Sequence, residues 1–141
     1  MLDKQSQEIY KKALTLLSNR EHSKLGLRRK LLQRGFRGES LDIVLDKLEN
    51  EGSLSDQRYA DCYARHRCSS GFGPNRVALE LREEGVSDIF IDAAISLLDF
   101  EFASGRDRYL NKLSHLDEPA KLKKLWQRGF DYKEDAFESS C

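Results

Sequence analysis

The sequence lacks the features that mark membrane-spanning proteins, secreted proteins and disulfide-rich proteins. No uninterrupted apolar run approaches the roughly 20 residues that a membrane-spanning helix needs. Residues 1–6 contain no apolar core of a secretion signal. The three cysteines include no Cys-x-x-Cys pair, so neither a disulfide framework nor a zinc site is indicated. We therefore expect a cytoplasmic protein with no membrane partner and no bound metal.

The sequence motifs of nucleotide-binding and hydrolytic enzymes are also missing. The three histidines, His22, His66 and His115, lie far apart, and no His-Glu-x-x-His motif occurs. Neither the Gly-x-Gly-x-x-Gly pattern nor the phosphate-binding loop ending in Gly-Lys-Ser/Thr is present. A histidine-cysteine site would require residues from distant parts of the chain to meet. We predict no cofactor and no catalytic activity.

The net charge of zero hides an uneven distribution of charged residues. Residues 1–50 carry 11 Lys and Arg against 7 Asp and Glu, a net charge of +4. Residues 51–99 carry 5 against 9, a net charge of −4, and residues 100–141 are balanced at 8 against 8. This distribution offers a positive first third to phosphates or acidic surfaces, and an acidic middle to a different surface.

A short pattern recurs three times along the chain: Leu, three residues, Gly and an apolar residue. It occupies residues 31–36, 81–86 and 125–130, so its glycines are 50 and then 44 residues apart. Twelve residues before these glycines stand Ser23, Gly73 and Asp117, of which the first and last are good helix N-cap residues. A glycine after a helix favours the left-handed conformation that ends it. The repeat therefore predicts three units of about three short helices each.

Apolar spacing predicts helices throughout and no strand of useful length. The first unit has apolar faces at Ile9, Ala13, Leu16 and Leu17, at Leu27, Leu31 and Leu32, and at Leu41, Val44, Leu45 and Leu48. The first helix of the second unit is predicted to use Tyr59, Cys62, Tyr63 and His66. The third unit ends in a short helix holding Ala136 and Phe137. The predicted fold is all-α: three tandem three-helix repeats, at 1–52, 53–98 and 99–141, in an elongated, curved array.

Candidate binding residues come mainly from basic stretches on the second helix of the first and third units, whereas the second helix of the second unit has a mixed face. The first contains six cations, which could meet phosphates or carboxylates or could form an ordinary solvated face: Lys24, Arg28, Arg29, Lys30, Arg34 and Arg37. The others are Arg67 and Arg76 in the second unit, and Lys121, Lys124 and Arg128 in the third.

Aromatic side chains that could stack on bases follow or lie within the same helices. Phe72, between two glycines, is the best candidate for an exposed ring. The helical spacing of Trp126 with Leu122 favours a core position for the indole. Phe36 and Phe130 follow the capping glycines, where an apolar residue normally folds back onto the helix end.

The chain resembles the RecX family from about residue 8 to residue 130, and three stretches within this range carry the resemblance most clearly. Residues 20–36 resemble its first repeat, and residues 51–60 are similar to its Gly-Tyr-Leu-Asp-Asp-x-Arg-Phe-Ala segment. Arg67 with residues 71–77 and 80–86 resembles its most distinctive signature, a Gly-aromatic-Gly-Pro-x-Arg element. The sequence departs from the family at three positions. Ser53 stands where the family has a tyrosine, Ser70 where it usually has a lysine, and Ala78 where it often has an arginine.

The resemblance implies tandem three-helix repeats and a regulatory protein with no catalytic activity. It implies binding in the groove of the RecA filament on DNA, with limited ATP hydrolysis and strand exchange, in DNA repair and the SOS response. Weaker binding to single- and double-stranded DNA is implied as well. The missing basic residues of the middle repeat leave Arg76 as its main basic contact.

Two other functions are compatible with the residues alone. A helix-turn-helix transcription regulator would read one duplex site as a symmetric dimer, but no dedicated dimer helix is evident and we expect a monomer. A generic helical adaptor would bind proteins without any role for nucleic acid.

Overall fold

The computed structural model describes residues 2–131 of the chain. Within these residues the chain forms eight α-helices and no strand, which confirms the all-helical prediction. The helices are α1 (Lys4–Asn19), α2 (Lys24–Gln33), α3 (Glu39–Asn50), α4 (Asp56–Ser69), α5 (Pro74–Glu83), α6 (Asp88–Ser96), α7 (Asp99–Lys112) and α8 (Glu118–Arg128).

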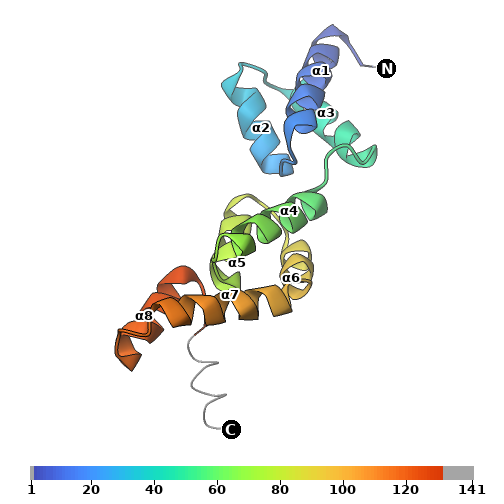
Figure 1. Ribbon diagram of the computed structural model, residues 1–141. Coiled ribbons are helices and arrows are strands. Elements are labelled where there is room, and N and C mark those ends of the chain that lie inside the picture. The colour runs from blue at the N-terminus through green and yellow to red at the C-terminus, as the bar shows by residue number, and fades with distance from the viewer. Residues whose placement is uncertain (1, 132–141) are drawn as a thin grey trace.

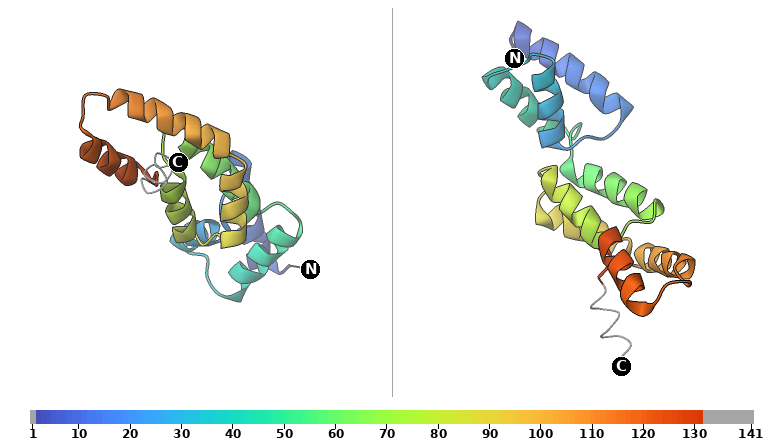
Figure 2. Two further views of the ribbon diagram at one scale, coloured as in Figure 1. Left: turned by 90° about the horizontal axis from the view of Figure 1, so that it is seen from below. Right: turned by 90° about the vertical axis from the view of Figure 1, so that its left-hand side faces the viewer.

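The helices follow one another along a long axis, so the molecule is elongated as predicted (Figures 1 and 2). Helices α1–α3 form one end, α4–α6 lie in the middle, and α7 and α8 lie at the other end. The expected last helix, with Ala136 and Phe137, falls outside the described residues. No helix of residues 2–131 combines the length and the apolar character needed to cross a membrane.

The predicted repeat corresponds to the second helix of each group. Ser23, Gly73 and Asp117 are the N-cap residues of α2, α5 and α8, and the side chains of Ser23 and Asp117 accept backbone N–H bonds there. The glycine after each of these helices has a positive φ, for example +91° at Gly35. Since a Cβ is costly in this conformation, the glycine sets the helix end.

Two separate apolar cores support the array. The first includes Ile9, Leu27, Leu31 and Leu45, and the second includes Val77, Leu81 and Ile91. Each core takes one side chain from beyond the predicted boundaries at residues 52 and 98: Leu54 joins the first and Phe102 joins the second. The division into units at these boundaries remains a prediction.

The predicted apolar face of α4 was partly wrong. Ala60, Ala64 and Cys68 are the buried residues of the helix, whereas Cys62 and His66 are exposed. Helix α4 packs against both α5 and α6. Small side chains on the packed face let these helices approach closely, so the larger residues lie to the side or outward.

The core position predicted for Trp126 was also wrong. The indole is 62% exposed, and Leu125 is the buried residue of α8. Helix α8 packs mainly against α7, and the contact uses only one narrow face of the helix. The expectation for Phe130 was correct, because its ring is 3% exposed behind Gly129.

Candidate functional site

The outer flank of α2 is occupied by ion pairs with α3. Lys24 Nζ lies 2.7 Å from Asp46 Oδ1 and 3.1 Å from Glu49 Oε1, and Arg28 Nε lies 3.1 Å from Asp42 Oδ1. Such half-exposed pairs contribute at most about 1 kcal/mol each. These two predicted binding residues therefore connect α2 to α3, and their charge is already balanced.

The other flank of α2 carries cations that lack an acidic partner. Among residues 2–131, no carboxylate lies within salt-bridge distance of Arg20, Lys30 or Arg34. Burial lowers the pKa of Lys30, and the charges of Arg20 and Arg34 lower it further. A negatively charged ligand would relieve this repulsion, so this flank favours binding of an anion.

His22 lies between Arg20 and Lys30 of this flank and is only 5% exposed. Its Nδ1 lies 3.0 Å from the Arg20 carbonyl oxygen, and its Nε2 lies 3.2 Å from Lys30 Nζ. Burial, followed by the charge of Lys30, lowers the pKa of the imidazole. The neutral ring therefore donates to Arg20 and accepts from Lys30, which directs the lysine ammonium.

A groove of about 940 Å³ separates this flank from α4. Two acidic residues, Glu21 and Glu84, line the groove. The cations that line it come from both sides: Arg20, Arg29, Lys30 and Arg67. Tyr59 and Tyr63 form part of the α4 wall, with ring centroids 5.7 Å apart. Burial raises the pKa of Tyr59 to about 12. The groove thus joins positive charge to two neutral aromatic rings.

A second basic cluster surrounds Phe72, which is half-buried rather than exposed as predicted. The guanidinium carbons of Arg67, Arg76 and Arg128 lie 3.8, 4.7 and 4.6 Å from the ring centroid. Glu80 accepts two bonds from Arg67, at 3.0 and 2.9 Å, and lies 3.6 Å from Arg76. Arg67 and Arg76 share this one carboxylate, and the side-chain hydrogen bonds of Arg128 go to carbonyl oxygens, so the cluster keeps a positive charge.

Two of these arginines, Arg76 and Arg128, connect α8 to the middle helices. Arg128 donates from Nε to the Gly71 carbonyl at 3.0 Å and from Nη2 to the Ser70 carbonyl at 3.2 Å. In the opposite direction, Arg76 Nη1 lies 3.5 Å from the Gln127 carbonyl. Cations at these positions satisfy the free carbonyls at the ends of α4 and α8.

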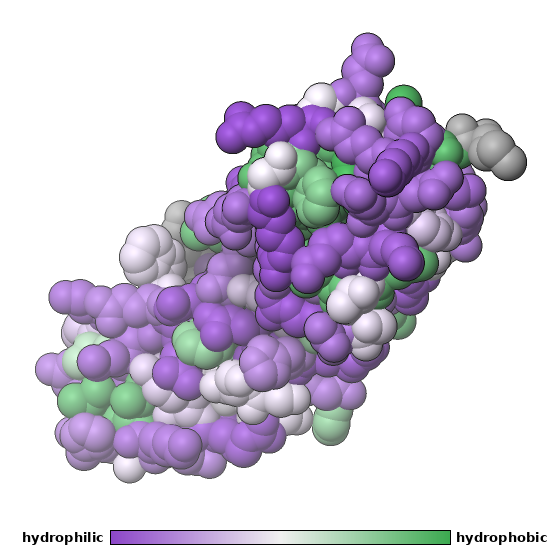
Figure 3. Space-filling view, turned by 90° about the horizontal axis from the view of Figure 1, so that it is seen from above, coloured by the Kyte–Doolittle hydropathy of each residue, from purple (hydrophilic) through white to green (hydrophobic). Residues whose placement is uncertain are grey.

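Arg67 belongs to both the groove and the Phe72 cluster, and so joins them. We call the cations of the groove and of the Phe72 cluster, together with Arg34 at the end of α2, the basic track: Arg20, Arg29, Lys30, Arg34, Arg67, Arg76 and Arg128. Figure 3 shows one face of the molecule, on which hydrophilic residues cover most of the surface and hydrophobic patches are small.

Some predicted residues lie outside the track. Lys24 and Arg28 are paired with α3, Arg37 is exposed in the α2–α3 loop, Lys124 is exposed, and Lys121 Nζ lies 3.6 Å from Glu118. Within residues 2–131, no three His, Cys, Asp or Glu side chains are grouped as a metal site would require.

Arg20, His22 and the two tyrosines were missed as candidate site residues. The stretch at residues 20–23, which carries part of the family resemblance, was the available signal for the first two.

Two family models match the chain. Residues 10–48 match the first three-helix domain of RecX, and residues 55–95 match its second three-helix domain. The regulatory protein RecX of Pseudomonas putida is 34% identical over 122 residues, which are 86% of this chain and 75% of that protein. The RecX of Pseudomonas entomophila is 36% identical over 118 residues, 84% of this chain but 66% of that protein.

Solved structures share the fold. The crystal structure of RecX from Lactobacillus salivarius has a TM-score of 0.75 at 23% identity, covering 92% of this chain and 90% of that one. Another crystal structure, of a regulatory protein RecX, has a TM-score of 0.80 at 22% identity, and the match covers 93% of this chain and 76% of that one. On the family models and the identity to curated relatives, this chain belongs to the RecX family of regulatory proteins.

Proposed function

We propose that this protein regulates the RecA recombinase by binding in the groove of the RecA–DNA filament, and that it limits ATP hydrolysis and strand exchange without catalysing a reaction itself. It would do so in the cytoplasm, as a monomer, during DNA repair and the SOS response. Membership of the RecX family supports a regulatory role. The observation that carries the proposal is the basic track, with three neighbouring cations that lack a carboxylate partner within residues 2–131.

The track is suited to the phosphate component of the filament. Lys30 and Arg20 stand on one side of the groove and Arg67 on the other, so a phosphodiester chain lying in the groove would meet cations from both. Binding would release counterions from the nucleic acid and would weaken as salt is added. Tyr59 and Tyr63 offer aromatic surface beside the phosphates. The same contacts would support weak binding to free single- and double-stranded DNA.

Reversal of two unpaired cations tests this proposal. The variant Arg20→Glu with Lys30→Glu should bind RecA–DNA filaments at least about tenfold more weakly, and its log-log salt dependence should be shallower by about 2. Lys4→Glu with Lys11→Glu is the control, because it makes the same change in net charge at exposed positions of α1. Equal filament affinities and salt slopes for the parent and both variants would contradict the proposal.

Affinities of the parent and the variants for filaments and for duplex DNA of different sequences separate the two other functions. A helix-turn-helix regulator would bind one duplex sequence much more tightly than filaments or random DNA. The binding affinity of a generic adaptor would not change when the cations of the basic track are reversed.

A further inference from the structure

One side of the middle helices carries an exposed apolar row that the basic track leaves unused. Ile89, Leu97 and Phe100 are 78%, 74% and 78% exposed, and Ala93 is exposed between the first two. Ile89, Ala93 and Leu97 follow at intervals of four, and Leu97 keeps α-helical backbone angles, so the three lie along one face of α6. Phe100 is also exposed, three residues beyond Leu97 on the first turn of α7, and we call these four residues the apolar row.

The charge beside the apolar row is negative. Asp88 and Asp92 flank it on α6, and Asp99 and Glu101 flank it at the start of α7. Asp88 is 3.0 Å from Arg82, whereas no Lys or Arg of residues 2–131 lies within salt-bridge distance of the other three carboxylates. Asp88, Asp92 and Asp99 therefore make up part of the −4 charge of residues 51–99, and none of the three belongs to the basic track.

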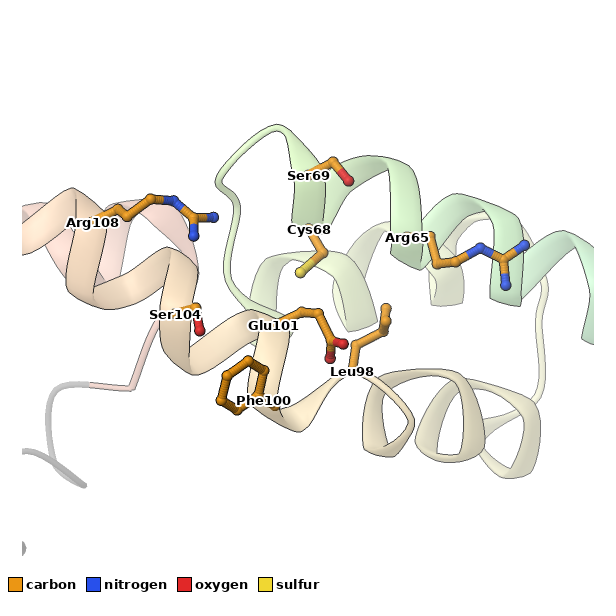
Figure 4. A pocket seen from close by; sticks show the side chains of 8 residues that line it. All are labelled: Arg65, Cys68, Ser69, Leu98, Phe100, Glu101, Ser104 and Arg108. Atoms are coloured by element: carbon orange, nitrogen blue, oxygen red, sulfur yellow. The ribbon is translucent and has the colours of Figure 1, made fainter.

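A cleft of about 440 Å³ adjoins the apolar row at Phe100 (Figure 4). Leu98 and Glu101 line one side of this cleft at the start of α7, and Cys68 of α4 lies on the other side. Arg65 and Arg108 stand at its two ends. The cleft can admit one apolar side chain next to Phe100, with a carboxylate near either arginine.

The cleft beside the apolar row and the groove use different sides of α4. Tyr59, Tyr63 and Arg67 line the groove, whereas Arg65 and Cys68 line the cleft. On a helix these two sets are separated by more than a quarter turn. A ligand in the groove therefore leaves the apolar row free for a second contact.

We propose that the apolar row is a protein-docking surface for an amphipathic helix of the filament protein. The partner helix would present an apolar ridge flanked by Lys or Arg side chains where it meets Asp92 and Asp99. Its ridge would place one apolar side chain in the cleft. This inference rests on the proposed function, and it assigns the protein contact to α6 and α7 while the nucleic acid contacts the basic track. Charge complementarity selects the basic flank, since unpaired carboxylates beside an apolar surface disfavour an acidic partner.

The test compares two surface variants of the full chain. Leu97→Ser with Phe100→Ser removes the centre of the apolar row, and Ile43→Ser with Leu79→Ser removes two side chains that are 53% and 55% exposed elsewhere. Affinity is measured for RecA filaments on single-stranded DNA and for the same DNA alone. We expect the first variant to lose about tenfold in filament affinity and nothing in DNA affinity, and the control to lose neither.

Each other outcome contradicts the inference. Unchanged filament affinity of the Leu97–Phe100 variant, beside a parent that binds filaments, overturns the docking surface and leaves the proposed function standing. Equal losses for both variants, or an equal loss for filaments and DNA, also overturn it. A parent that binds no filament removes the proposed function and the inference with it. Self-association of the parent that the Leu97–Phe100 variant abolishes would make a second copy the occupant.

Discussion

Replacing Gly73 with alanine should detach the α8 end from the middle helices without unfolding them. A Cβ at Gly73 would lie 2.4 Å from the Gly129 carbonyl carbon and 2.6 Å from the Phe130 nitrogen, both backbone atoms. The φ of Gly73 is −89°, an ordinary value, so the whole effect comes from this close approach. No side-chain movement can relieve a clash with backbone.

The magnitude follows from the contacts that this approach supports. Gly73 donates its N–H to the Arg128 carbonyl at 2.9 Å, Asn75 donates to the Gly129 carbonyl at 2.9 Å, and the Arg128 side chain donates to two carbonyls. Losing these bonds together should destabilise the contact between α8 and the middle helices by about 3 to 5 kcal/mol. The loss cannot be larger, because α8 then separates from the middle helices.

Hydrogen exchange at Asn75 provides the assay, because its N–H bond crosses the junction. A loss of about 3 kcal/mol should speed exchange of this amide by about a hundredfold, while amides in the α1–α3 core keep their protection. Gly52→Ala is the control: Gly52 has a φ of +83° with nothing near its Cβ position, so it should cost about 1 kcal/mol and leave Asn75 protected. Protection of Asn75 within about twofold of the parent in Gly73→Ala would refute this reasoning.

Three further predictions concern stability. Leu27→Ala should lower the free energy of unfolding in urea by about 2 to 5 kcal/mol, because the side chain is completely buried in the first core; a loss below about 1 kcal/mol would contradict that packing. Arg128→Ala and Arg128→Lys should both weaken protection of Asn75, since lysine keeps the charge but not the two directed N–H bonds; full protection in the lysine variant would show that charge alone suffices. Burial and the charge of Lys30 lower the pKa of His22 below its ordinary 6.5, so the unfolded chain binds more protons there and stability should fall as pH falls through 6.5. His22→Gln should flatten this pH dependence of the urea midpoint, and an unchanged slope would contradict the assignment.

The order of the helices and the buried faces of α1, α2 and α3 were predictable because their signals are local. Ser23, Asp117 and the glycine at Gly35 act on neighbouring backbone groups, so their effect can be read from a short stretch. The faces of α4 and α8 depend instead on which helices pack against them. Cys62 and Trp126 were therefore misplaced, although the helices themselves were predicted correctly.

The basic track depended more strongly on tertiary structure. Its cations come from the α1–α2 connection and from α2, α4, α5 and α8, and sequence spacing gave no reason to expect Arg67, Arg76 and Arg128 around one ring. The reverse holds for Lys24 and Arg28, which the charge pattern favoured as binding residues. Carboxylates of α3 pair with both, and only the packing of α3 beside α2 reveals this.

The central claim is that this protein regulates RecA through the basic track. The most direct measurement is the rate of ATP hydrolysis by RecA on single-stranded DNA, titrated with the protein from well below equimolar amounts. The account predicts that the rate falls with the parent and with Lys4→Glu/Lys11→Glu, but not with Arg20→Glu/Lys30→Glu at the same concentrations. A rate that stays constant with the parent, or that falls equally with all three proteins, would contradict it.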